Sequence, residues 1–214
     1  MTDSWPEEDV AELPAPEAAQ PVESETAMPP MDAPPLEVPE PLLRTPDEHA
    51  GGGLEVPDGF AVLEGTAEGA RRGVAVVVSR FNGEIGTALL ASALDELERA
   101  GVLREAITVV PVPGAFELPL AAMAFAKTRR YACVVALGCV IRGETPHFDL
   151  VAGEAASGLQ LAALETGVPV AFGVLTTETV EQAQARTDKG AEAARCALEM
   201  ADLFAQLRVA AAAT

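Results

Sequence analysis

The sequence has few cysteines, few basic residues and no long apolar run, and each shortage excludes a class of protein. Its three cysteines, Cys133, Cys139 and Cys196, have no paired spacing, so they predict neither a disulfide framework nor a metal site and fit a reducing cytoplasm. Lysine and arginine total 14 against 33 acidic residues, which argues against a nucleic-acid partner held through its phosphates. No uncharged apolar run reaches the ~18 residues that cross a bilayer, and the first residues do not resemble a signal peptide. We therefore expect a cytoplasmic protein that binds neither membrane nor nucleic acid.

Residues 1–58 have a composition of their own. They contain 12 of the 17 prolines and 15 of the 33 acidic residues, but a single basic residue, Arg44. Such a segment has few bulky apolar groups to bury and repels itself, so we predict a disordered acidic, proline-rich extension. The glycines at 51–53 look like the end of a linker, and we expect one folded domain over residues 59–214.

The remainder of the chain alternates short apolar runs with segments of helical spacing. The β-branched run at residues 74–79 is typical of a strand buried on both faces. Three similar runs follow, at residues 106–112, 133–141 and 168–174. Helical spacing after each run predicts helices at about residues 86–100, 118–129, 149–165 and 189–207. Strands alternating with helices predict an α/β fold whose four-stranded parallel sheet carries helices on both faces.

Some shorter features add local expectations. The alternating sequence from Phe60 is a candidate edge strand, and Thr177 is a candidate N-cap for a short helix through Gln182 and Arg186. Pro111 and Pro113 are expected to end the second strand, because proline cannot donate to a sheet ladder.

The strand ends carry the residues of a candidate binding site. Ligands bind to an open parallel sheet beyond the carboxyl ends of its strands. The predicted ends carry Phe81, then Phe116 with Glu117, and then Phe172. Aromatic side chains suit a flat heterocycle, and a carboxylate with backbone groups can bind its polar edges.

The end of the third strand carries polar chemistry. Residues 142–147, R-G-E-T-P-H, include a turn whose backbone N–H groups and hydroxyl can hold an anion, and His147 can transfer protons near neutral pH. Arg186, beyond the fourth strand, can pair with a phosphate through its fork of donors. Taken alone, each feature also fits a solvated surface loop, so it is their combination that indicates a ligand site.

Five motifs, in this order, resemble the 6,7-dimethyl-8-ribityllumazine synthase family: S-R-F-N, V-P-G-A-F-E-L-P, L-G-C-V-I-R-G-E-T-P-H-F-D, V-P-V-A-F-G-V-L-T-T-E and K-G-A-E-A-A. The resemblance runs from about residue 60 to the last helix and leaves residues 1–58 outside. It implies a flavodoxin-like three-layer αβα sandwich, assembled as pentamers or as shells of pentamers. It also implies a transferase that joins 5-amino-6-(D-ribitylamino)uracil to 3,4-dihydroxy-2-butanone 4-phosphate, the penultimate step of riboflavin biosynthesis. This reaction uses no metal or organic cofactor.

The resemblance further implies a role for each site residue. Phe81 stacks on the pyrimidine, His147 donates a proton, and Phe172 completes the ring pocket from a neighbouring subunit. The residues implied to line the ring and ribityl pocket are Ala115, Phe116, Glu117, Cys139, Val140 and Ile141. Those implied to receive the butanone phosphate are Glu144, Thr145 and Arg186. Riboflavin synthase is a candidate protein partner.

Two alternatives stay open at this point. A non-catalytic flavin- or pterin-binding oligomer of the same fold would need the aromatic and carboxylate residues but neither His147 nor Arg186. An archaeal-type riboflavin synthase is a second enzyme hypothesis, although G-E-T-P-H matches the lumazine synthase pattern. The chain also departs from that pattern, because only Thr187 and Asp188 separate Arg186 from Lys189, where the family usually has a longer connection that bears on subunit contacts.

Overall fold

Four parallel strands form a single sheet at the centre of the protein. The computed structural model describes residues 54–212, so the predicted extension, apart from residues 54–58, lies outside the described residues. The strands are β1 (Val74–Ser79), β2 (Ile107–Val112), β3 (Cys133–Ile141) and β4 (Val170–Thr177). Their order across the sheet is β2-β1-β3-β4, which is the flavodoxin-like order.

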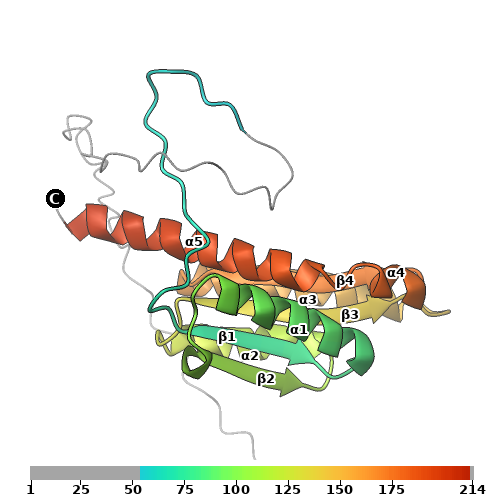
Figure 1. The fold of residues 1–214 in the computed structure, drawn as a ribbon. Helices are drawn as coiled ribbons and strands as arrows, with labels where there is room; N and C mark the ends of the chain where they lie inside the picture. The colour runs from blue at the N-terminus through green and yellow to red at the C-terminus, as the bar shows by residue number, and fades with distance from the viewer. Residues whose placement is uncertain (1–53, 213–214) are drawn as a thin grey trace, which may run out of the picture. The chain divides into compact units, whose positions relative to one another are not determined.

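Helices cover both faces of this sheet (Figure 1). The first face packs α1 (Gly83–Arg99) and α5 (Lys189–Ala212) against the side chains of alternate β1 residues such as Val76. The opposite face packs α2 (Leu118–Lys127) and α3 (His147–Thr166) against the intervening residues, such as Val77. Three short helices complete the fold: η2 (Arg104–Ala106), η3 (Ala115–Glu117) and α4 (Val180–Gln184). The predicted three-layer α/β fold with a four-stranded parallel sheet is confirmed.

The second strand continues through a proline that was expected to end it. Pro111 lies inside β2, opposite Val78 of β1. The prediction was wrong because β2 is an outer strand of the sheet, where one side of the strand needs no ladder partner and proline is tolerated.

The segment that begins at Phe60 is not an edge strand. Its polar groups bind to α5 instead: the backbone N and the Oγ1 of Thr66 both donate to Asp202, at 3.0 and 3.1 Å, and Gln206 donates to the carbonyl oxygen of Glu64 at 2.9 Å. Gly65 allows this close approach, since a Cβ there would lie 2.0 Å from the carbonyl oxygen of Glu199. The alternating pattern missed this arrangement because the partners lie more than a hundred residues away along the chain.

Several element ends also differ from the sequence-based expectations. Thr177 lies in β4 rather than at a helix start, and the N-cap of α4 is Thr179, whose hydroxyl accepts from the backbone N of Gln182 at 3.3 Å. The helix expected from residue 149 begins at His147, and α5 runs to Ala212. No helix within residues 54–212 combines the length and the apolar character needed to span a membrane.

Candidate active site at the carboxyl ends of the strands

Three strand ends are linked into one rim by hydrogen bonds. The backbone N of Phe81, just after β1, donates to the carbonyl oxygen of Pro113, just after β2, at 3.1 Å. Asn82 Nδ2 donates to the carbonyl oxygen of Cys139 in β3 at 3.0 Å. Asn82 has a φ of 58°, in the left-handed region that asparagine tolerates better than most residues. The structure therefore brings together the loops that were predicted to carry the site.

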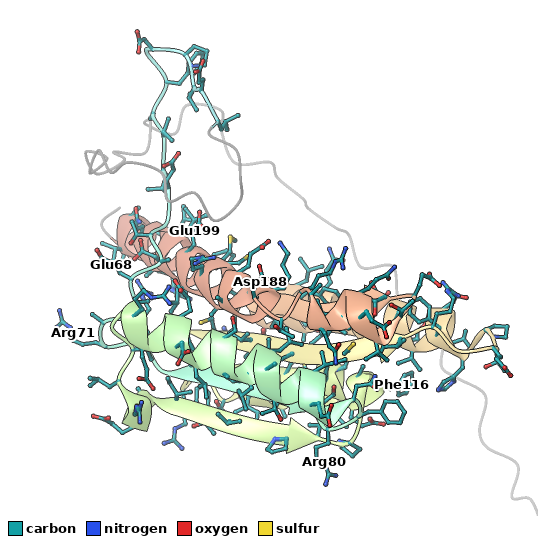
Figure 2. The ribbon with its side chains drawn as sticks, turned by 45° about the vertical axis from the view of Figure 1, so that its right-hand side comes forward. Glu68, Arg71, Arg80, Phe116, Asp188 and Glu199 are labelled. Carbon is teal, nitrogen blue, oxygen red and sulfur yellow. The ribbon has the colours of Figure 1, made fainter. Side chains whose placement is uncertain are left out.

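Two of the predicted aromatic residues stand exposed on this rim. Phe81 is 71% exposed and Phe116, in η3, is 57% exposed. On either side of Phe116 in the chain, Ala115 is buried and Glu117 is half-buried at the start of α2. Figure 2 shows Phe116 and Arg80 at the same end of the sheet, with Arg71 and Glu68 at the opposite end. Exposed phenyl rings beside a half-buried carboxylate form a surface suited to a flat, polar-edged ligand.

The end of β3 supplies mainly backbone groups. Cys139 is buried, and burial raises the pKa of its thiol against a smaller lowering by a hydrogen bond with Thr177. A neutral thiol is a poor nucleophile, so the contribution of Cys139 is its carbonyl oxygen, which accepts from Asn82. Val140 and Ile141 are half-buried at the end of the strand.

The turn after β3 leads directly into a helix. Glu144 and Thr145 are exposed in a bend, and His147 is the exposed first residue of α3. Prediction had placed His147 in a loop. Its position matters because the first backbone N–H groups of a helix lack partners within the helix and favour a negatively charged ligand. The turn predicted to bind an anion and His147, the predicted proton donor, therefore adjoin one helix start.

The cations near this site differ in whether a carboxylate already neutralises them. Arg142 pairs with Asp149 and Glu178, and Lys189 pairs with Glu192. Arg186, in the turn after α4, donates from Nη1 to the carbonyl oxygen of Gln182 at 2.8 Å, and no carboxylate within residues 54–212 pairs with it. Arg186 is therefore better placed than Arg142 or Lys189 to bind a phosphate.

Phe172 lies away from the rim, contrary to the prediction that placed it at a strand end. It sits opposite Ala136 near the start of β4, which continues for five residues to Thr177. Those residues span about 17 Å at 3.3 Å each. Phe172 is 46% exposed and lines a groove of about 280 Å³ between β4 and the start of α5, together with Lys189 and Cys196. One copy of the chain therefore does not bring Phe172 to Phe81.

Sequence reasoning missed three residues that shape the rim: Asn82, Asp149 and Glu178. Asn82 entered only as part of the S-R-F-N motif, yet its side chain joins β1 to β3. Asp149 carried a usable signal, since an acidic residue in the first turn of a helix just after a strand-end arginine suggests a pair. Glu178 carried none, because its contact with Arg142 depends on the pairing of β3 with β4.

Together, the fold and the rim define a class: parallel α/β proteins that bind a small ligand at the carboxyl edge of the sheet. Comparison with known families narrows this class. The model of the 6,7-dimethyl-8-ribityllumazine synthase family matches residues 72–205, so the chain belongs to this family. The match confirms the resemblance in the five motifs. It identifies the chain as a member of a transferase family of riboflavin biosynthesis.

Proposed function

We propose that the protein condenses 5-amino-6-(D-ribitylamino)uracil with 3,4-dihydroxy-2-butanone 4-phosphate to give 6,7-dimethyl-8-ribityllumazine, phosphate and water. The observation that carries this proposal is one rim, in a chain of this family, that holds exposed aromatic rings, an exposed turn before a helix start and a histidine. The aromatic pair Phe81 and Phe116, with Glu117, suits the pyrimidine. The turn at Glu144–Thr145 suits the phosphate of the second substrate.

In this proposal His147 handles protons while the rest of the rim positions the reactants. The amine of the pyrimidine attacks the carbonyl carbon of the butanone phosphate, and water leaves as the imine forms. Loss of phosphate then requires a proton to be taken from carbon and the leaving group to be stabilised, which suits an imidazole near neutral pH. The ribitylamino nitrogen finally attacks the remaining carbonyl carbon, which closes the ring and releases a second water. Holding two reactants in register can itself supply roughly 7–11 kcal/mol of the barrier.

The active unit is proposed to be a pentamer or a multiple of it. Support comes from the placement of Phe172, which lies about 17 Å before the carboxyl end of β4 within one copy but which a neighbouring copy could bring to the rim. The expected result is a native mass that is a multiple of five subunits, measured by native mass spectrometry alongside a turnover assay. A monodisperse monomer with full activity would contradict the assignment of Phe172. The connection between Arg186 and Lys189, which bears on subunit contacts in the family, is short in this chain. The native mass therefore also tests whether pentamers assemble into shells.

The function is tested by mixing both substrates with the full-length protein and following lumazine fluorescence. The expected result is product formation well above the uncatalysed rate. The alternative, a non-catalytic flavin- or pterin-binding oligomer, predicts binding of a ring ligand with no condensation above background. His147 and Arg186 favour the enzyme, because a protein that only binds a ring needs neither.

Replacing Arg186 with alanine is expected to raise the KM for the butanone phosphate by about tenfold, as a charge-assisted contact made in the ground state is lost. The kcat should change much less. Steady-state kinetics with each substrate varied in turn provides the measurement. Arg80→Ala is the matched control, because Arg80 is also an exposed arginine at the rim. If the KM rises in the Arg80 variant instead, the phosphate site lies on the β2 side of the rim.

Three further parts of the proposal concern the setting of the reaction. We place the enzyme in the cytoplasm, supported by cysteines without paired spacing and by its membership of a biosynthetic family. No metal or organic cofactor takes part in the proposed chemistry. Riboflavin synthase, which would consume the product, is the proposed protein partner.

A further inference from the structure

Arg142 joins three segments of the chain at the rim. Its backbone N donates to the carbonyl oxygen of Thr177 at 2.9 Å, which extends the pairing of β3 with β4 by one residue. Its side chain then reaches in two directions. Nη1 and Nη2 donate to the two carboxylate oxygens of Asp149 at 3.2 and 3.0 Å, and Nε donates to Glu178 Oε1 at 3.0 Å. Asp149 belongs to the first turn of α3, and Glu178 follows β4 directly.

The guanidinium also stacks on the residue after His147. Its central carbon lies 4.1 Å from the centroid of the Phe148 ring, within the range of a cation–π contact. Arg142 therefore holds both residues that follow His147 in the chain, one by a bidentate pair and one by stacking. A planar fork that also lies flat on a ring is specific to arginine, because the compact ammonium group of lysine has no such plane.

The electrostatics keep this arrangement charged at neutral pH. Asp149 and Glu178 raise the pKa of Arg142, and the hydrogen bonds from Arg142 lower the pKa of Asp149. The Arg142 and Asp149 side chains are 37% and 60% exposed, so solvent screens the pair and it adds little to folding stability. With its charge compensated by two carboxylates, Arg142 is also a poor phosphate ligand. Neither stability nor substrate charge therefore accounts for it.

We propose that Arg142 is a positioning residue for His147 and for the turn at residues 143–146. The inference rests on the proposed function, since it assigns Arg142 a part in placing the proton-transfer group. The turn follows Arg142 directly and leads into the first turn of α3, where the Arg142 side chain contacts Phe148 and Asp149. One side chain therefore connects the two ends of the turn. Loss of the contacts of Arg142 with Phe148 and Asp149 lets His147 shift, and a displacement of about 1 Å can cost up to 10²-fold in rate.

The first test is Arg142→Lys in the full-length protein, which keeps the charge but removes the fork and the stacking. We expect kcat to fall about tenfold, with the KM for the pyrimidine changed less than about twofold and the melting temperature nearly unchanged. Arg104→Lys is the matched control, because Arg104 also pairs with a carboxylate, Glu98, but precedes β2 at the opposite end of the sheet. That variant should leave kcat unaltered. A kcat that is equal in the two variants would overturn the proposal.

Asp149→Asn provides a second route to the same loss, and it keeps the test available if the arginine variant folds poorly. It should lower kcat by a similar factor. The double variant Arg142→Lys/Asp149→Asn should lose no more than either single variant, because both remove one shared contact. Fully additive losses would show that the two residues act separately and would overturn the proposal.

Hydrogen–deuterium exchange over residues 143–150, measured without substrate, separates this inference from the proposed function. We expect faster exchange in Arg142→Lys than in wild type, and no change in Arg104→Lys. If wild type does not catalyse the condensation, the proposed function fails. The exchange result still tests whether Arg142 orders residues 143–150. A lowered kcat with unchanged exchange would mean that Arg142 contacts the substrate itself. Faster exchange with unchanged kcat would mean that the ordering of this segment by Arg142 does not affect catalysis by His147. Each of these two results overturns the proposal.

Discussion

Replacing His147 with alanine is expected to lower kcat for the condensation by about 10²-fold. This is the low end of general acid–base effects, which reach about 10⁴-fold. The low end is expected because His147 is exposed at the start of α3, where water can partly replace the imidazole. The KM for the pyrimidine should change little, since Phe81, Phe116 and Glu117 still provide its binding surface. Steady-state kinetics with each substrate varied in turn measures both quantities.

The chain offers its own control for the histidine variant. The other histidine of the chain, His49, precedes the part matched by the family model. His49→Ala should therefore leave kcat and both KM values unchanged. Added imidazole should restore part of the activity of His147→Ala but not of Arg142→Lys, because only the first variant lacks the proton-transfer group. His147 is not the proton donor if His147→Ala keeps the wild-type kcat. The same holds if the whole loss in kcat/KM comes from a higher KM.

The features that the sequence predicted well are those written in one local stretch. The strands were found because runs such as V-A-V-V-V-S at residues 74–79 are β-branched and uninterrupted, which suits a strand buried on both faces. The residues after β1, β2 and β3 could be placed at one rim without knowing the strand order, because parallel strands share a carboxyl edge. Phe81, Glu117 and His147 were placed at this rim in this way.

The features that prediction missed depend on which strands are neighbours and in what register. Pro111 is compatible with β2 only because β2 is an outer strand. Phe172 faces Ala136 rather than the rim because of how far β4 extends along β3. The contact of Glu178 with Arg142 needs the same pairing. No single stretch of sequence contains this information, so these residues could not be placed from local pattern.

The short connection before α5 has a physical explanation in the structure. The backbone N of Lys189 donates to the carbonyl oxygen of Arg186 at 3.1 Å, and that of Gly190 donates to Thr187 at 3.3 Å. The chain therefore passes from α4 to α5 through a tight turn with no intervening loop. After this turn, the first residues of α5 pack directly against α1. Gly190 is the residue that makes this close approach possible.

Replacing Gly190 with alanine is expected to destabilise the fold by about 3 kcal/mol, the upper end for overpacking. A Cβ at this position would lie 2.1 Å from the carbonyl oxygen of Leu89 and 3.2 Å from the backbone N of Ala93. Both atoms belong to the backbone of α1, so no side-chain rotation can relieve the contact and the two helices must separate. At about 2–4 °C per kcal/mol, the melting temperature should fall by about 6–12 °C. Thermal unfolding at matched protein concentration measures the shift.

Gly153→Ala is the control that separates packing from helix propensity. Gly153 also lies within a helix, α3, but a Cβ there would meet nothing within 4 Å. Alanine is the better helix former by about 0.8–1.0 kcal/mol, so this variant should melt slightly higher than wild type. The two substitutions are chemically identical, so opposite shifts would attribute the cost at Gly190 to the α1–α5 crossing. If Gly190→Ala also melts higher, that crossing is not as close as the structure has it, and the glycine of K-G-A-E-A-A has another role.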